Sequence, residues 1–146
     1  MAKLLDSKTR ACMVIVRDDH CPHVHASHKQ ERWVVRLWFS FGSPAVGVMS
    51  IAPSERAVRQ RQLSQMLDEL AVHLSDARRM WWDGKRTTCL ENKWIARISP
   101  ARLSVLSERR PGARRVRSAH YDGATGRTMV TFTDGTEDRI EGGEAR

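Results

Sequence analysis

Four of the chain's six histidines lie within nine residues, at positions 20, 23, 25 and 28, next to two aspartates and a cysteine. Imidazole and carboxylate groups bind divalent transition metals and transfer protons near neutral pH. In an extended segment His23 and His25 project from the same face and could bind one ion. Pro22 would bring His20 or Asp19 round to it. The sequence therefore predicts a site for one divalent metal (Zn, Fe, Mn or Ni) at His20, His23, His25 and Asp19.

The same cluster permits two other interpretations. The imidazoles could simply hydrogen-bond to the backbone and to carboxylates in a polar turn. Alternatively, two imidazoles with an arginine such as Arg17 or Arg36 nearby could cleave a phosphodiester by acid–base chemistry, with or without a metal. The H-x-H-x-H pattern of histidine-triad hydrolases is absent, because residue 27 is serine. No catalytic residue is assigned from the sequence, and whether the protein is an enzyme stays open.

The basic residues predict a polyanionic partner. The chain has 25 Lys+Arg against 17 Asp+Glu, for a net charge of +8, and 20 of the basic residues are arginine. Arginine forms paired hydrogen bonds with phosphate and stacks on bases, whereas lysine acts as a point charge. Solvated surface charge is the alternative interpretation. The predicted nucleic-acid-binding residues are Arg78, Arg79, Lys85, Arg86, Arg109, Arg110, Arg114 and Arg115.

The order of apolar patterns predicts an α+β fold. Strands are expected at 11–16, 32–39 and 45–51, with Trp33, Val35, Leu37 and Phe39 on one face of the second and Val34, Arg36 and Trp38 on the other. One long helix should follow from about residue 60 to residues 83–84, where Asp-Gly stops it. The five tryptophans are expected in the core. Later elements are a strand at 93–98, a short helix at 100–107, and strands at 115–121, 127–132 and 136–140.

This pattern predicts an antiparallel meander covered by the long helix, followed by a C-terminal three-stranded meander. The expected units are 1–99, a short helix with a basic linker at 100–114, the second meander at 115–141, and a frayed tail at 142–146. The longest apolar run, 11–16, is too short for a membrane helix, and Asp6 interrupts any signal-peptide core. Three cysteines without C-x-x-C spacing favour the cytoplasm.

The segment Asp19-His20-Cys21-Pro22-His23-Val24-His25 resembles a small bacterial family of unknown function marked by a D-H-x-P-P-H-x-H motif. The helix around residues 70–74 that leads to Trp81-Trp82 is similar to that family's closing helix. Residues 115–141, with Val116, Phe132 and Asp134-Gly135, are similar to the opening of a second small family often encoded beside the first. Cys21 replaces the motif's first proline, and Val24 replaces its usual aromatic.

The resemblance implies a toxin–antitoxin or mobile-element setting and highlights Asp19, His20, His23 and His25. Together with the charge, it predicts a small cytoplasmic protein that binds nucleic acid or a cognate protein partner, with the histidine cluster as its functional surface. Two alternatives remain. One is a metal-dependent or histidine-based phosphodiesterase or nuclease, and the other is a pure protein-interaction module such as an antitoxin or inhibitor.

Overall fold

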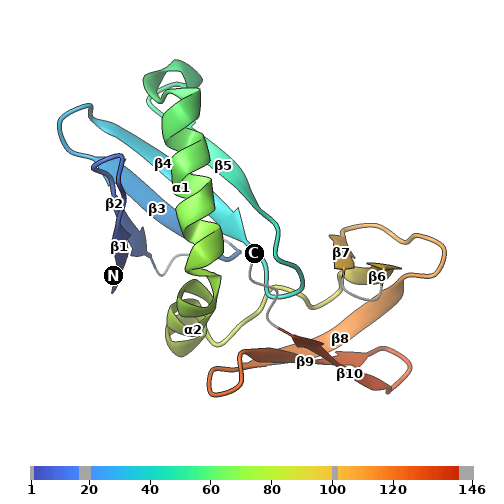
Figure 1. Ribbon diagram of the computed structural model, residues 1–146. Helices are drawn as coiled ribbons and strands as arrows, with labels where there is room; N and C mark the ends of the chain where they lie inside the picture. Colours follow the sequence, from blue (N-terminus) through green and yellow to red (C-terminus); the bar gives the residue numbers. More distant parts are fainter. Residues whose placement is uncertain (1, 17–20, 100–101, 142–146) are drawn as a thin grey trace.

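The computed structural model describes residues 2–16, 21–99 and 102–141, and within them it contains two antiparallel five-stranded sheets and two α-helices (Figure 1). The predicted α+β class is therefore confirmed. The first sheet comprises β1 (Ala2–Asp6), β2 (Cys12–Ile15), β3 (His23–His28), β4 (Trp33–Phe39) and β5 (Val46–Ala52). The short 3-10 helix η1 (Glu55–Ala57) and the helices α1 (Gln60–Val72) and α2 (Leu74–Lys85) follow. The second sheet comprises β6 (Trp94–Ser99), β7 (Arg102–Leu106), β8 (Arg114–Asp122), β9 (Arg127–Phe132) and β10 (Glu137–Glu141).

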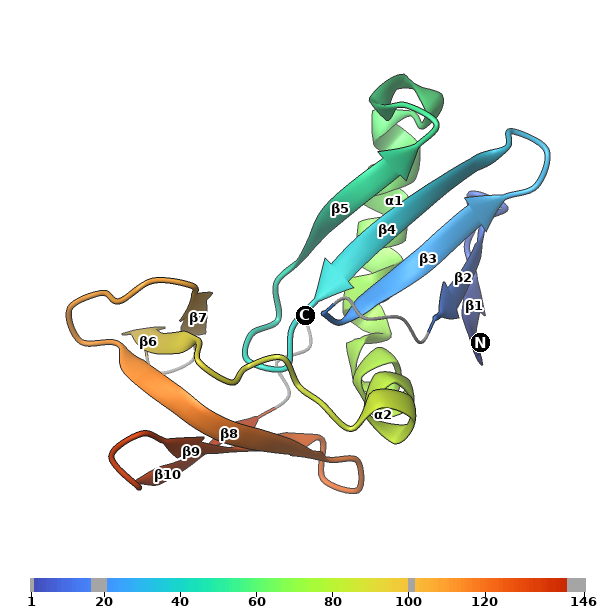
Figure 2. The same ribbon diagram turned by 180° about the vertical axis from the view of Figure 1, so that it is seen from behind.

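The first sheet is a simple meander in which each strand pairs with the next along the chain. Its fourth strand, β4, alternates as predicted: the face with Trp33, Val35, Leu37 and Phe39 is buried, whereas Val34 and Trp38 are exposed. The buried face packs on α1, and Figure 2 shows the opposite face of the sheet in front of that helix. The sheet therefore has one covered face and one open face.

The single long helix predicted from the apolar stripe is wrong, because the chain breaks at His73 into α1 and α2. His73 has φ −99° and ψ 21°, so it ends one helix and begins the other. An unbroken helix over residues 60–85 would be about 39 Å long and would run past the sheet. The break instead lets α2 pack against β1, β2 and also β8 of the second sheet. The predicted start near residue 60 is confirmed.

The second sheet has the strand order β10-β9-β8-β6-β7. The three strands β8 to β10 form the expected meander, but they do not stand alone, because the hairpin β6–β7 extends the sheet. The short helix predicted at 100–107 is wrong: Arg102–Leu106 is a strand, with Val105 paired to Ile95. Leu103 and Val105 both pack against the core, as alternating residues of a strand do. The predicted basic linker is the connection from β7 to β8.

A close approach at Gly42 holds the two sheets together. Gly42 follows Phe41, whose carbonyl accepts a hydrogen bond of 3.1 Å from the Thr128 hydroxyl of β9. A methyl group on Gly42 would lie 2.6 Å from Val105 Cγ2, which is closer than carbon atoms can approach. The loop after β4 can therefore reach β7 only because residue 42 has no side chain.

We expect Gly42→Ala to lower the free energy of unfolding by about 1–3 kcal/mol, because the added methyl group overpacks the junction. Gly123→Ala is the matched control, since its methyl group would meet nothing closer than Arg79 Cγ at 3.6 Å. Urea unfolding of both variants measures the difference. Equal stability of the two variants would contradict this account of the junction.

Candidate histidine site on the first sheet

His23 and His25 form a directly bonded imidazole pair at the start of β3. Their Nε2 atoms are 3.0 Å apart, and their ring centroids are 4.9 Å apart. The two residues are two positions apart along an extended strand, so both side chains project from the same side. The predicted same-face placement of His23 and His25 is confirmed.

The backbone determines which nitrogen of His23 carries a proton. Nδ1 of His23 lies 2.8 Å from the carbonyl oxygen of Cys21. A carbonyl only accepts hydrogen bonds, so this nitrogen must be the donor. In neutral His23 the Nε2 atom is then unprotonated and accepts a hydrogen bond from Nε2–H of His25. The pair thus holds one proton between its two facing nitrogens.

The two rings differ in accessibility. His23 is fully buried and contacts Trp81 of α2, with a distance of 5.6 Å between ring centroids. His25 is partly exposed. His23 is therefore held from behind by the helix and by the Cys21 carbonyl, and His25 is the member of the pair that a ligand can reach.

The pair has the geometry of two neighbouring ligands of one metal ion. Metal–nitrogen bonds of about 2.0–2.1 Å place two adjacent nitrogens about 2.9–3.4 Å apart, which includes the observed separation. Ligating histidines commonly donate their other N–H to a backbone carbonyl, as His23 does. Among residues 2–16, 21–99 and 102–141, no group of three potential ligands is assembled. The other predicted ligands, Asp19 and His20, lie outside the described residues.

Two nearby side chains of ligand type have other roles. His28 is the buried last residue of β3, and its Nδ1 accepts a hydrogen bond of 2.9 Å from the backbone N–H of Glu31 in the following turn. Burial and a hydrogen bond with the Cys21 thiol raise the pKa of the Cys89 thiol to about 12. The Cys89 thiol is therefore protonated at neutral pH when no metal is bound.

Arg36 and Trp38 of β4 lie beside the histidine pair. In the strand register His25 is opposite Arg36, and His23 is opposite Trp38. Directly opposed residues of antiparallel strands project from the same face, and at the first position of β3 the buried His23 ring also reaches Trp81 of α2, so only His25 of the pair shares the open face with Arg36 and Trp38. The expectation that all five tryptophans are core residues is wrong for Trp38, which is 38% exposed. In the strand alternation Trp38 lies on the face opposite to Trp33 and Leu37, and this position is the sequence signal for its exposure.

The buried Arg78 of α2 corrects the predicted nucleic-acid interface. Its side chain is only 2% exposed. Nε donates to the Ser40 carbonyl and Nη2 to the Ser43 carbonyl, both at 2.9 Å. A guanidinium buried in this way cannot reach a phosphate, so we remove Arg78 from the interface. Arg78 is four residues from Leu74 and three from Trp81, so helical periodicity places it on the apolar stripe. This spacing was the sequence signal for its burial, but Arg78 was instead grouped with its neighbour Arg79 as a basic cluster.

The other predicted basic residues lie on two separate elements. Arg79, Lys85 and Arg86 belong to the second half of α2 and its C-terminus, where Arg79 pairs with Asp76 at 2.9 Å. The remaining four surround the exposed turn between β7 and β8, namely Arg109, Arg110, Arg114 and Arg115. Arg114 stacks its guanidinium 3.7 Å above the Phe132 ring, and Arg115 donates to Asn92 at 3.1 Å. All four arginines are exposed, but Arg114 and Arg115 also make contacts within the second sheet and its adjoining loop.

Comparisons with protein-family models, with curated proteins and with solved structures find no match for this chain. The resemblance suggested by the segment from Asp19 to His25 therefore stays a prediction. In the described part of the chain, neither helix has the length and apolar character needed to cross a bilayer.

Proposed function

We propose that this protein binds single-stranded nucleic acid on the open side of the first sheet. The surface concerned, called here the histidine face, comprises His25, Arg36 and Trp38. The observation that supports it is the placement of an exposed indole, a guanidinium and an imidazole on adjacent strands of a sheet whose other face is covered by helices.

Each of the three side chains has a function in this proposal. Exposed aromatic rings on a sheet stack on unpaired bases. Arg36 pairs with a backbone phosphate, and His25, whose Nε2–H is donated to His23, accepts a hydrogen bond at Nδ1 from a ribose hydroxyl or a base-edge amino group. The net charge of +8 supplies the general attraction to a polyanion. A single strand is favoured over a duplex because only unstacked bases expose their faces to an indole.

The test is the binding of an unstructured RNA oligonucleotide over a series of salt concentrations. Arg36→Gln should weaken binding about five- to tenfold and reduce the slope of log K against log salt by about 0.7, the contribution of one phosphate contact on a single strand. Lys29→Gln is the matched control, because Lys29 is an exposed cation in the turn of the same hairpin, away from the histidine face.

Three outcomes would contradict the proposal: no binding of the wild-type protein at low salt, equal effects of the two substitutions, or tighter binding of a duplex than of the single strand.

The second candidate function is metal-dependent or histidine-based phosphodiester cleavage. It is favoured by the 3.0 Å separation of the two Nε2 atoms, which suits a metal ion or the transfer of a proton. His25 would face the substrate, and His23 would hold the His25 ring in position. Arg36 would stabilise charge on the phosphate. Zinc binding and zinc-dependent cleavage of RNA are the measurements that test this candidate.

A further inference from the structure

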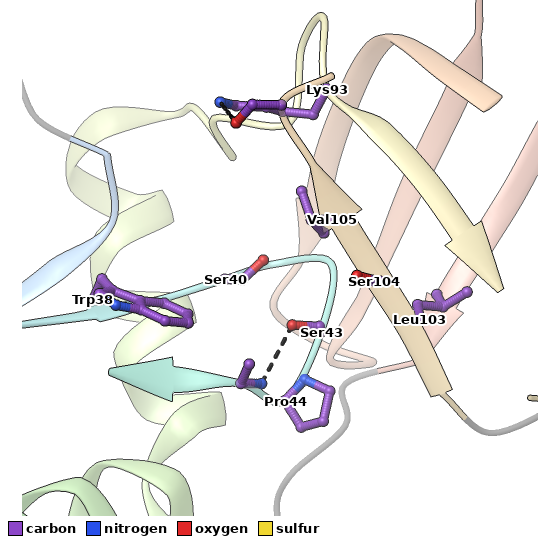
Figure 3. A pocket seen from close by; sticks show the side chains of 10 residues that line it. Trp38, Ser40, Ser43, Pro44, Lys93, Leu103, Ser104 and Val105 are labelled. Atoms are coloured by element: carbon purple, nitrogen blue, oxygen red, sulfur yellow. Dashed lines mark hydrogen bonds between the residues drawn. The ribbon is translucent and has the colours of Figure 1, made fainter. Parts of the chain in front are cut away.

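A pocket of about 850 Å³ opens next to Trp38, between the end of β4 and the strand β7 (Figure 3). Its volume is within the range of about 300–1,000 Å³ typical of small-molecule sites. The loop after β4 forms one wall and β7 the other, so the pocket exists only because the two sheets are joined. It adjoins the histidine face, since Trp38 belongs to both.

The side chains around the pocket are of three kinds. Trp38 supplies an aromatic surface, and Leu103 and Val105 of β7 supply apolar contacts. Four hydroxyl groups line the walls, and Lys93 adds a positive charge; none of the described residues that line the pocket is acidic. The hydroxyl groups belong to Ser40, Ser43, Ser104 and Ser107.

Gly47 of β5 determines where the indole of Trp38 lies. Gly47 and Trp38 are paired across the strands. A methyl group on Gly47 would lie 2.5–2.7 Å from three atoms of the indole, including Nε1. The ring therefore lies flat across the glycine, with part of its surface exposed beside the pocket. An aromatic surface held at the edge of a hydroxyl-lined pocket is suited to a flat, polar-edged ring.

We propose that this pocket takes one nucleotide of the bound strand, with its base stacked on Trp38. The base edge would hydrogen-bond to the serine hydroxyls, and the ammonium of Lys93 would contact the adjoining phosphate. This assignment rests on the proposed single-strand binding and adds to it the place where one base is held. The positive charge of Lys93, with no carboxylate among the described lining residues, favours this anionic ligand over a basic peptide.

The experiment compares an RNA 8-mer with a strand of the same length in which every nucleotide is abasic. Wild-type protein should bind the base-bearing strand about tenfold more tightly, because stacking on an aromatic side chain stabilises each stacked base by that order. Gly47→Ala should remove most of this preference by displacing the indole. Ser104→Phe should do the same by filling the pocket, whereas Ser118→Phe on the exposed side of β8 should not.

The outcomes separate the two proposals. If wild-type protein binds neither strand, the proposed function fails and this inference fails with it. If it binds both strands equally, or if Gly47→Ala and Ser104→Phe keep the wild-type preference, the pocket assignment is overturned while single-strand binding stands. Urea unfolding of the two variants verifies that they are folded under the conditions of the assay. Loss of the preference in both folded variants, with the Ser118→Phe protein unchanged, supports the assignment.

Discussion

Replacing Arg78 by methionine is expected to lower the free energy of unfolding by about 3 kcal/mol. The part-buried carbonyl groups of Ser40 and Ser43 would each lose a charged donor at 2.9 Å. A buried acceptor left without a partner costs about 1–3 kcal/mol. Methionine is long and apolar, so it keeps most of the packing, and the loss reports mainly on the hydrogen bonds.

Arg79→Met is the matched control for this substitution. Arg79 is the next residue of the same helix, and its exposed ion pair with Asp76 contributes little. Its effect on the unfolding free energy should stay within about 0.5 kcal/mol. Urea unfolding of both variants measures the difference, and the slope of each transition is compared to verify that the two variants expose the same surface on unfolding. A stability of Arg78→Met equal to that of Arg79→Met would show that the loop after β4 does not depend on the buried guanidinium.

The structure explains why sequence patterns located some elements and missed others. The alternation of β4 could be predicted because its two faces meet different surroundings, core on one side and solvent on the other. The break at His73 could not, since Leu70 and Leu74 keep the helical spacing across it. Local pattern reports which side chains are buried, but it does not report the direction in which a helix leaves the sheet.

The same distinction applies to the candidate site. His23 and His25 could be placed on one face because their spacing along a strand fixes the side from which they project. Trp38 and the pocket beside it depend on how the loop after β4 meets β7, which is a contact between residues far apart in the sequence. Arg78 was misassigned because charge suggested the surface, although its helical position lies on the buried stripe.

Loading the protein with zinc is expected to give about one bound ion per chain, with His23 and His25 as two of its ligands. The ion would replace the proton that now lies between the two Nε2 atoms, which are already 3.0 Å apart. Little movement of the rings is needed, because the Cys21 carbonyl already holds His23. Since imidazole must be unprotonated to bind metal, affinity should fall as the solution is made more acidic.

Elemental analysis and calorimetry of tag-free protein measure this binding. His25→Gln should reduce occupancy from about one ion per chain to near zero, because removing a ligand from so small a site costs most of its affinity. His120→Gln is the control, since His120 is an exposed imidazole of β8, on the other sheet. Near-zero occupancy of the wild-type protein after loading, or equal occupancy in the two variants, would leave a hydrogen-bonded pair without a metal.

The same protein samples distinguish binding from catalysis. Wild type and His25→Gln are incubated with single-stranded RNA, with and without zinc, and both retention and cleavage of the RNA are followed. We expect retention without cleavage, because the sequence offers no recognisable catalytic triad to support the histidines. Zinc-dependent cleavage that His25→Gln abolishes, with strand affinity retained, would instead assign the imidazole pair to phosphodiester chemistry.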